Sequence, residues 1–587
     1  MSGAVNLRRD LNKAMDRRII SDRKLDALLR NIGAHPYLLA AFVCFGLTAF
    51  GYDSQKFING FTVYFVLALV AGRFFLKLLR GLNDRSKNSA AVWMGFWGKF
   101  LIAFAAAEYF VKTEDKAQFV CFAGIVFTLI LYILLLNNDR KYYDKIKCLA
   151  LAAAGFVLRF SYVLESDIYT RQNDVWLFGG EGGHAGYIEY IYNHHALPDF
   201  DPTTLWQYYH PPLHHIICAV WLKFCSMFGI EYYMACEALQ SLSMFYICVV
   251  LITLYKILRL FGLKGKALTI PFGIASVYPY LVMMSGAINN DPLMLCFLMG
   301  ALYCTVRWYR EQTAKNIVKI ALCIGLGMMT KLSVGLIAPA VAVVFIVVLI
   351  KNRKNILNRL GQLCLFGAVC CPLGLWWSIR NLIRFKVKPT YIPMLSETDG
   401  QYIGEVPLVK RFTDFSLSQF KSVFEQWGGE SYKEYNPTVA MLKNSMFGEG
   451  INESHFPEQA LIIPRLLFWA AAILAAFSFV IMLVMLFRKT EGASFAEKFL
   501  LTASHLTVLG NYYIFCARYK FICTMNFRYI VPCMLIGLIN IGVFSQLCQK
   551  TEKAKAGELA LKIISFLSSA FIALAYATMF LVIASNA

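Results

Sequence analysis

Residues 463–487 read IPRLLFWAAAILAAFSFVIMLVMLF, an apolar run that contains one charged residue, Arg465, near its start. A run of about 20 apolar residues is long enough to cross the hydrocarbon core of a bilayer as a helix. Similar runs recur along the whole chain of 587 residues, in which 58% of the residues are hydrophobic and 16% are charged. Soluble domains carry about 25% charged residues. The sequence therefore predicts an all-α polytopic membrane protein and excludes a soluble multidomain enzyme, a disordered chain and a small disulfide-bonded scaffold.

The apolar runs predict about fifteen transmembrane helices. Connections rich in Lys and Arg alternate with connections that hold few, and the basic ones belong on the cytoplasmic side of a membrane. This alternation places the N-terminus in the cytoplasm. The expected spans fall near residues 37–51, 61–79, 91–111, 117–136, 146–164, 234–258, 268–286, 291–308, 317–331, 334–350, 361–380, 463–487, 497–516, 529–547 and 562–583.

The same pattern divides the chain into parts. In chain order they are a basic cytoplasmic leader (1–36), an N-terminal extension of four transmembrane helices (37–136), a core (146–547) with outer loops at 165–233 and 382–462, and a cytoplasmic linker with the final transmembrane helix (548–587). The apolar segment 211–229 lies in the first outer loop. If it crossed the membrane, the basic connection that follows would fall outside, so we expect a juxtamembrane helix along the outer surface.

Charge and cysteine content exclude further classes of protein. The net charge of +21 does not indicate a nucleic-acid partner, because the basic residues collect in the short connections between apolar runs. Most of the 17 Cys lie inside apolar runs, where Cys acts as a small hydrophobic residue. The sequence has no CxxC pair with the spacing of a metal site.

One part of the first outer loop differs from the rest of the chain. Residues 165–210 contain seven acidic residues and a single basic residue, Arg171, and six of the nine His lie within residues 184–215. This local excess of acids and His on the outer side is the first functional signal in the sequence.

Two motifs lie in this loop. The first is RQND (171–174) followed by EGGHAGY (181–187). A carboxylate near a helix end, beside glycines that let a ligand approach, suits a general base, and a solvated acidic loop is the alternative. The second is YYHPPLHH (208–215), in which the prolines mark a helix start. Its adjacent His214 and His215 cannot both face one ion from a helix, which disfavours a zinc site.

Two further motifs lie at the outer ends of transmembrane helices. Asp291, in the short turn NNDP (289–292), is either an N-cap or a ligand contact. Lys331, Arg380 and Arg528 are cations that depart from the basic-inside pattern, and such residues are functional candidates. Snorkelling to lipid headgroups is the alternative. Because the guanidinium fork matches phosphate oxygens, an anionic lipid phosphate is the expected partner.

In this order the motifs resemble the GT-C superfamily of membrane glycosyltransferases, and in particular the branch of protein O-mannosyltransferases and aminoarabinose transferases (glycosyltransferase family 39-like). The likeness covers about residues 146–547 and implies a GT-C-like fold in a bacterial plasma membrane. It rests on HAGYI (184–188), LPD (197–199), YHPPL (209–213), Asp291, Thr330-Lys331, Trp377 with Arg380-Asn381, and Arg528-Tyr529 with Pro532.

The resemblance implies a polyprenyl-phosphate-linked sugar as donor, inversion at the anomeric carbon, and an acidic general base in the first outer loop. That role falls to Asp174, with Glu181 as the alternative, because the compact Asp-Glu motif of the O-mannosyltransferases is replaced here by two separated acids. The implied acceptor is a hydroxyl of a protein, a lipid or a glycan. A divalent cation as cofactor is compatible with the resemblance but is not required by it. The implied substrate-binding residues are His184, Tyr187, His210, Asp291, Lys331, Arg380, Arg528 and Tyr529.

Two other functions stay open. A transporter or flippase would be expected to carry inverted repeats and charged residues near the middle of the membrane, and the sequence shows no internal repeat. A non-catalytic protein that binds a lipid-linked sugar is the second, because the acidic motif departs from the spacing of the family.

Overall fold

The computed structural model describes residues 35–51, 143–426, 433–550 and 555–585. The chain divides into two compact units, Met1–Phe127 and Thr128–Ala587. The described part of the first unit contains the helix α2 (Pro36–Gly51), where the first transmembrane span is expected. Most of the predicted leader and the three other spans of the N-terminal extension lie outside the described residues.

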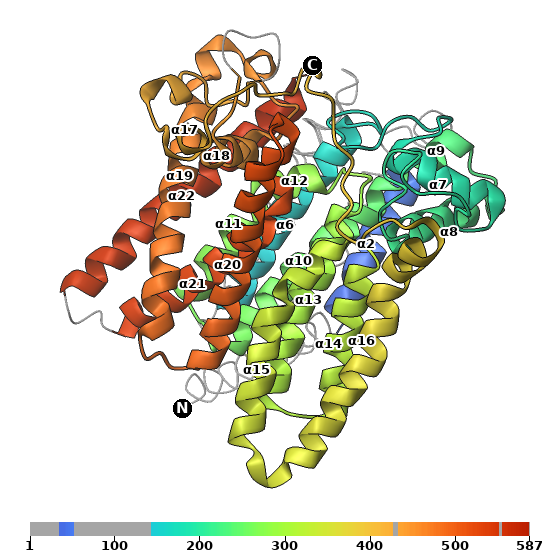
Figure 1. Cartoon of the computed structure of the whole chain (residues 1–587). Coiled ribbons are helices and arrows are strands. Elements are labelled where there is room, and N and C mark those ends of the chain that lie inside the picture. The colour runs from blue at the N-terminus through green and yellow to red at the C-terminus, as the bar shows by residue number, and fades with distance from the viewer. Residues whose placement is uncertain (1–34, 52–142, 427–432, 551–554, 586–587) are drawn as a thin grey trace, which may run out of the picture. The chain divides into compact units, whose positions relative to one another are not determined.

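The described part of the second unit is built from helices, many of which run side by side (Figure 1), with one isolated β-bridge between Tyr402 and Phe521 and no strand. The longer helices are α6 (Tyr143–Glu165), α7 (Gly183–His194), α8 (Leu213–Met227), α10 (Gln240–Leu260), α11 (Lys266–Val277), α13 (Asp291–Arg310), α14 (Ala314–Met328), α15 (Ala338–Lys351), α16 (Ile356–Phe385), α18 (Pro437–Phe447), α19 (Ile462–Phe487), α20 (Phe495–Arg518), α21 (Val531–Lys550) and α22 (Lys555–Ala584). The shorter elements are α9 (Tyr232–Glu237), α12 (Pro279–Met284), α17 (Leu408–Thr413), η1 (Leu332–Ile337), η2 (Arg353–Asn355), η3 (Leu417–Phe420), η4 (Glu453–His455), η5 (Glu458–Ala460), η6 (Ile522–Met525) and η7 (Phe527–Tyr529).

Nine helices within the described residues are long and apolar enough to cross a membrane. They confirm the predicted all-α polytopic membrane class. The expected spans at 37–51, 268–286 and 317–331 are not among the nine, because shorter helices form them: α2, α11 with α12, and α14. The apolar segment 211–229 forms α8, whose 15 residues are fewer than the about 20 that a membrane-spanning helix needs.

A proline explains why the span at 268–286 is broken. Pro279 has no N–H to donate to the carbonyl of Ala275, so the helix cannot continue unchanged through this position. The side chain of Arg159 on α6, which is fully buried, donates to the carbonyl oxygens of Ser276 at 2.7 Å and Ala275 at 3.5 Å. Gly155, one turn earlier on α6, permits this approach, because a Cβ there would lie 2.0 Å from the Ser276 oxygen.

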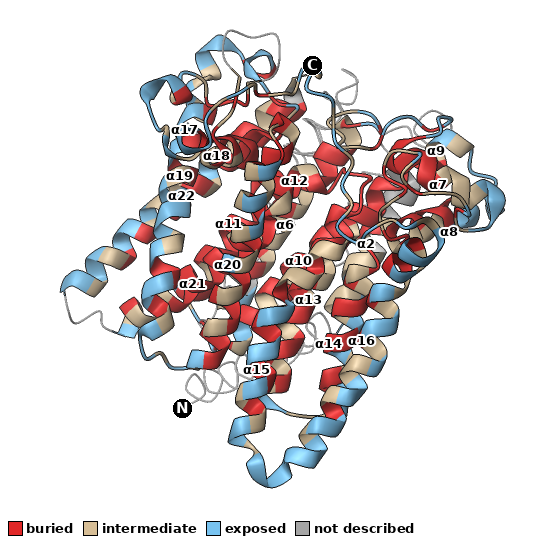
Figure 2. Ribbon diagram, in the orientation of Figure 1, coloured by how far each residue is buried: buried red, intermediate tan, exposed pale blue. Residues whose placement is uncertain are grey.

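Burial separates central from peripheral helices in the second unit (Figure 2). Most side chains of α10, α13 and α21 are buried, whereas α16, α19 and α22 carry many exposed ones. Large apolar side chains are among the exposed residues of these peripheral helices, for example Leu357, Val480 and Phe566. Exposed apolar side chains on long helices are the groups that lipid chains cover in a membrane protein.

The two outer loops of the second unit form small packed structures. The first carries α7, α8 and α9, and the second carries α17 and α18, with α18 packed against α12 and α19. Both loops gather at the end of the helices that lies away from the connection between α15 and α16 (Figure 1). The candidate site lies where residues of these loops meet the helix ends.

Candidate active site

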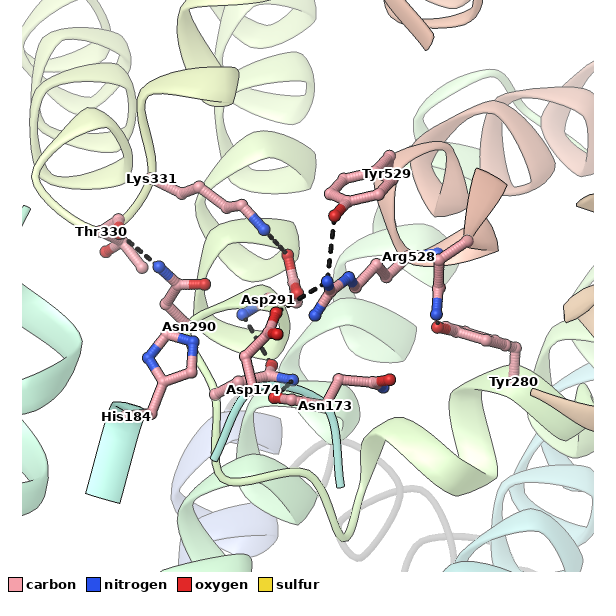
Figure 3. A network of polar contacts seen from close by, with 12 residues as sticks. Asn173, Asp174, His184, Tyr280, Asn290, Asp291, Thr330, Lys331, Arg528 and Tyr529 are labelled. Carbon is pink, nitrogen blue, oxygen red and sulfur yellow. Dashed lines mark hydrogen bonds and ion pairs between the residues drawn. The ribbon is translucent and has the colours of Figure 1, made fainter. Parts of the chain in front are cut away.

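Two ion pairs form the centre of the site (Figure 3). Lys331 Nζ lies 2.5 Å from Asp291 Oδ1, and Arg528 Nη2 lies 2.7 Å from Asp174 Oδ2. The aromatic ring of Tyr529 contacts both cations, with the Lys331 nitrogen 5.3 Å and the Arg528 guanidinium 5.0 Å from its centre. Five residues predicted from four separate parts of the sequence therefore lie together.

Each of the four charged residues comes from a different element. Asp174 lies in the loop after α6, and Asp291 is the first residue of α13. Lys331 connects α14 to η1, and Arg528 lies in η7 just before α21. Only 3% of the Asp291 side chain, 8% of Arg528, 13% of Lys331 and 28% of Asp174 is exposed, so three of the four charges are largely removed from water.

The structure distinguishes between the two interpretations of Asp291. The N-cap of α13 is Asn290, whose side chain makes no capping hydrogen bond, and the N–H of Asp291 is accepted by Asn289 Oδ1 at 3.1 Å. Asp291 instead directs Oδ1 to Lys331, while its Oδ2 is buried and has no hydrogen-bond partner among the described residues. The Nε of Arg528 is also buried and finds no partner in the part of the chain that the structure describes. Buried polar atoms that lack partners are rare in folded proteins and indicate a place that a ligand or water completes.

The backbone around Asp174 is strained. Arg171, Asp174 and Trp176 have positive φ values of 53°, 59° and 60°. The carbonyl oxygen of Asp174 accepts the N–H of His184 at 3.0 Å, which ties the acidic segment to the N-terminus of α7. Backbone strain of this kind persists where the surroundings impose it, and it is concentrated at functional sites.

The glycines of the acidic motif serve packing in this structure. A Cβ on Gly182 would lie 2.5 Å from the ring of Trp176, and one on Gly183 would lie 2.7 Å from the Trp176 Cβ. The Trp176 ring stacks on Trp206 with centroids 6.4 Å apart. The space beside these glycines is therefore filled by Trp176. Glu181 is exposed and forms no ion pair with any described residue, so it does not join the two ion pairs.

Histidines of the predicted site form a stacked, buried group. His184 Nδ1 lies 2.9 Å from His215 Nε2, and the His184 ring stacks on His210 and His215 with centroids 5.7 and 5.2 Å away. Tyr187 continues the stack beyond His215 at 4.0 Å. Burial lowers the pKa of His184, His210 and His215 well below the ordinary value, and it lowers the pKa of His214 to about 4. These imidazoles are therefore neutral at physiological pH.

Arg380 lies apart from the two ion pairs. Its guanidinium stacks 4.5 Å above the ring of Trp377, donates to the carbonyl of Pro198, and lies 3.7 Å from an oxygen of Asp199. In this structure Arg380 therefore holds the Leu197–Asp199 turn of the first outer loop.

A cavity of about 290 Å³ adjoins the ion pairs and is lined by Asp291 and Arg528. It is also lined by Gln172 of the RQND motif, and by Tyr280 and Glu449, which no sequence motif indicated. Glu449 comes from the long outer loop and is partly buried, and burial raises the pKa of its carboxyl against the lowering effect of Arg528. The sequence feature that could have indicated Glu449 is its position between two glycines, Gly448 and Gly450.

No cluster of three or more His, Cys, Asp or Glu in the described part of the chain has a metal-binding arrangement. The described residues therefore do not indicate where a divalent cation would bind.

Residues 210–377 match the family model of dolichyl-phosphate-mannose-protein mannosyltransferases, and no curated protein matches the chain. The matched segment includes His210, Asp291 and Lys331 and ends before Arg380. It supports the predicted resemblance to GT-C membrane glycosyltransferases. Together with the apolar helices, it supports a multi-pass membrane protein that is similar to membrane glycosyltransferases.

Proposed function

We propose that this protein transfers a sugar from a polyprenyl-phosphate-linked donor to an acceptor hydroxyl, with inversion, at the outer face of the membrane. The observation that carries this proposal is the pair of adjacent ion pairs, Lys331–Asp291 and Arg528–Asp174, beside a cavity. Two cations at helix ends are the groups that a lipid-linked phosphate requires, because such a donor is met at the bilayer boundary.

In the proposed reaction the donor phosphate binds Lys331 and Arg528. Both cations are neutralised by carboxylates in the structure, so an arriving phosphate competes with Asp291 and Asp174 for them. Competition at Arg528 releases the Asp174 carboxylate from its ion pair. Donor binding thereby prepares the base, and we expect the donor to bind before the acceptor.

Asp174 then acts as the general base. It takes the proton of the acceptor hydroxyl as the acceptor oxygen bonds to the anomeric carbon from the face opposite the phosphate. The bond from that carbon to the phosphate oxygen breaks, and polyprenyl phosphate leaves with the electron pair. Lys331 and Arg528 stabilise the charge that develops on the leaving group, which is the main electrostatic demand of this step.

The charge pattern supports the proposed location of the site. Basic connections on the opposite side favour a position of the first and second outer loops outside the cytoplasm, and we propose that they lie at the outer face of a bacterial plasma membrane. Lys331 lies in the segment that matches the mannosyltransferase family, and Asp174 and Arg528 extend the same site on either side of that segment. The acceptor is a protein, a lipid or a glycan.

The release of polyprenyl phosphate from a panel of polyprenyl-phosphate-sugar donors tests the proposal. Purified wild type, Asp174→Asn and Glu181→Gln are assayed in parallel with crude membrane acceptors. We expect Asp174→Asn to lower turnover by about 10²–10⁴-fold, the usual contribution of a general base, and to retain donor binding. We expect Glu181→Gln to stay close to wild type because Glu181 is exposed.

The remaining outcomes lead to other conclusions. If turnover were lost only in Glu181→Gln, the general base would be Glu181, and the proposed glycosyl transfer would still hold. If folded wild-type protein released nothing from any donor, the proposal would fail, and transport or non-catalytic binding of a lipid-linked sugar would explain the chain better. Retained release after treatment with EDTA would show that no divalent cation is needed.

A further inference from the structure

Glu449 is a third carboxylate at the candidate site, and it comes from a part of the chain outside the family match. It lines the same cavity as Asp291 and Arg528. Asn526, which is fully buried, donates from Nδ2 to Glu449 Oε1 at 2.5 Å. The Oδ1 of Asn526 accepts the Tyr280 hydroxyl at 2.5 Å and the N–H of Arg528 at 2.8 Å. One amide therefore fixes Glu449 relative to the segment that carries Arg528.

The backbone on both sides of Glu449 is fitted to this position. Gly448 has a φ of 59° and a ψ of −159°, a conformation that is open essentially to glycine alone. A Cβ on Gly450 would lie 3.0 Å from the side chain of Arg171. Asn444, earlier in the long outer loop, accepts the N–H of Phe527 at 2.9 Å. The loop is thus held against the site at two points.

Two residues that line the cavity with Glu449 also have buried polar atoms for which no hydrogen bond is formed with the described residues. Asp291 Oδ2 and Arg528 Nε are buried, and no described residue hydrogen-bonds to either atom; their side chains are 3% and 8% exposed. Other lining residues are Gln172 and Asn289, whose side-chain amides hydrogen-bond to backbone groups, and Tyr280, whose hydroxyl donates to Asn526. Amides, hydroxyls and carboxylates are the groups that exchange hydrogen bonds with hydroxyl-rich ligands.

We propose that Glu449 accepts hydrogen bonds from the ring hydroxyls of the donor sugar and thereby selects which sugar is transferred. This inference rests on the proposed function, and it adds a specificity-determining residue to that site. A carboxylate repels phosphate, so Glu449 is unsuited to the donor phosphate that Lys331 and Arg528 would hold. A cavity of about 290 Å³ is at the lower end of the range for small-ligand pockets, about 300–1,000 Å³, which suits a single sugar ring.

The test compares Glu449→Gln with Glu453→Gln, a matched change at an exposed position of the same loop. Glutamine keeps the size of the side chain and an oxygen that can accept from Asn526. For each protein we measure the KM and kcat for the sugar-bearing donor, the selectivity among donors, and inhibition by sugar-free polyprenyl phosphate. Thermal unfolding in detergent shows whether each variant is folded.

We expect Glu449→Gln to raise the donor KM about 10-fold or more and to change the order of preference among sugars. Inhibition by sugar-free polyprenyl phosphate should stay within about 2-fold of wild type, since that molecule lacks the group that Glu449 contacts. Glu453→Gln should change neither quantity.

Four outcomes would overturn a role for Glu449 in sugar selection. They are an unchanged KM, an unchanged order of preference among sugars, equal weakening of the sugar-free inhibitor, and a collapse of kcat at constant KM, which would assign proton transfer to Glu449. Each of them leaves the proposed glycosyl transfer intact, because wild type remains active. Absence of release by wild type would instead refute the proposed function itself.

Discussion

Lys331 and Asp291 show how a charge pair at the site combines a structural and a functional role. The Asp291 side chain is 3% exposed, so its charge depends on the Lys331 nitrogen 2.5 Å away. Removing one partner of a buried pair costs about 3–5 kcal/mol, because the remaining charge has no compensation.

We therefore expect Lys331→Met to lower both the stability and the donor affinity of the protein. The double variant Asp291→Asn with Lys331→Met removes both charges and should recover most of the lost thermal stability while remaining inactive. Thermal unfolding and donor binding, measured on both variants, separate the two roles. A double variant that recovered donor binding would show that Lys331 does not hold the phosphate.

The buried histidines predict how stability depends on pH. His184, His210, His214 and His215 have lowered pKa values because of burial, whereas an unfolded His titrates near 6.5. The unfolded chain therefore binds more protons below pH 6.5, so stability is complete above about pH 6.5 and falls below it. The loss is about 1.4 kcal/mol per His at pH 5.5.

Thermal unfolding in detergent between pH 8 and pH 5.5 checks this expectation. His214→Gln removes one of the four titrating groups and should reduce the slope of Tm against pH in the acidic range. An unchanged Tm across this range would contradict the assignment of neutral, buried imidazoles.

At the residue scale, the sequence located most of the charged site residues but not their partners. Asp174, Asp291, Lys331 and Arg528 stood out because acids and cations are unusual at these positions of a membrane protein. Their pairing could not be predicted, since 354 residues separate Asp174 from Arg528 along the chain, and no local pattern records which helix ends become neighbours.

At the scale of helices, the contact between α6 and α11 supports the broken segment that leads to the site. Gly155 of α6 lies against the carbonyl of Ser276, where the chain turns from α11 into α12. The hydropathy of residues 268–286 predicts a continuous helix, because apolar content does not reveal which carbonyls lose their partners at Pro279. In the sequence, Arg159 is an isolated charge in an apolar run. The structure shows that its side chain donates to backbone carbonyls of α11.

A pair of Gly→Ala variants tests this contact. Ala normally favours a helix interior over Gly by about 1 kcal/mol. At Gly367 of α16, where an added Cβ meets nothing within 4 Å, we expect Ala to be neutral or slightly stabilising. At Gly155 the added Cβ would lie 2.0 Å from a carbonyl oxygen, so we expect a clear loss of thermal stability. Equal Tm values for the two variants would contradict the close approach of the helices.

At the scale of the whole molecule, the alternation of basic connections predicts the side of the membrane on which the site lies. Single Cys substitutions at Ser396, in the long outer loop, and at Asn352, between α15 and α16, test it with a membrane-impermeant maleimide. In intact cells we expect labelling at residue 396 alone, and labelling at residue 352 only after permeabilisation. The reverse pattern would place the site in the cytoplasm.

The sequence by itself determined that this is an all-α, multi-pass membrane protein with its unusual charges at helix ends, because helix length and Lys/Arg bias are local properties. Only the tertiary structure decided that Asp174 meets Arg528, that Glu181 is exposed, that Arg380 holds a turn, and that Glu449 reaches the cavity. These contacts depend on how helices pack and on where the long loop folds back. Packing of this kind depends on the shapes and the burial of side chains that are hundreds of residues apart in the sequence.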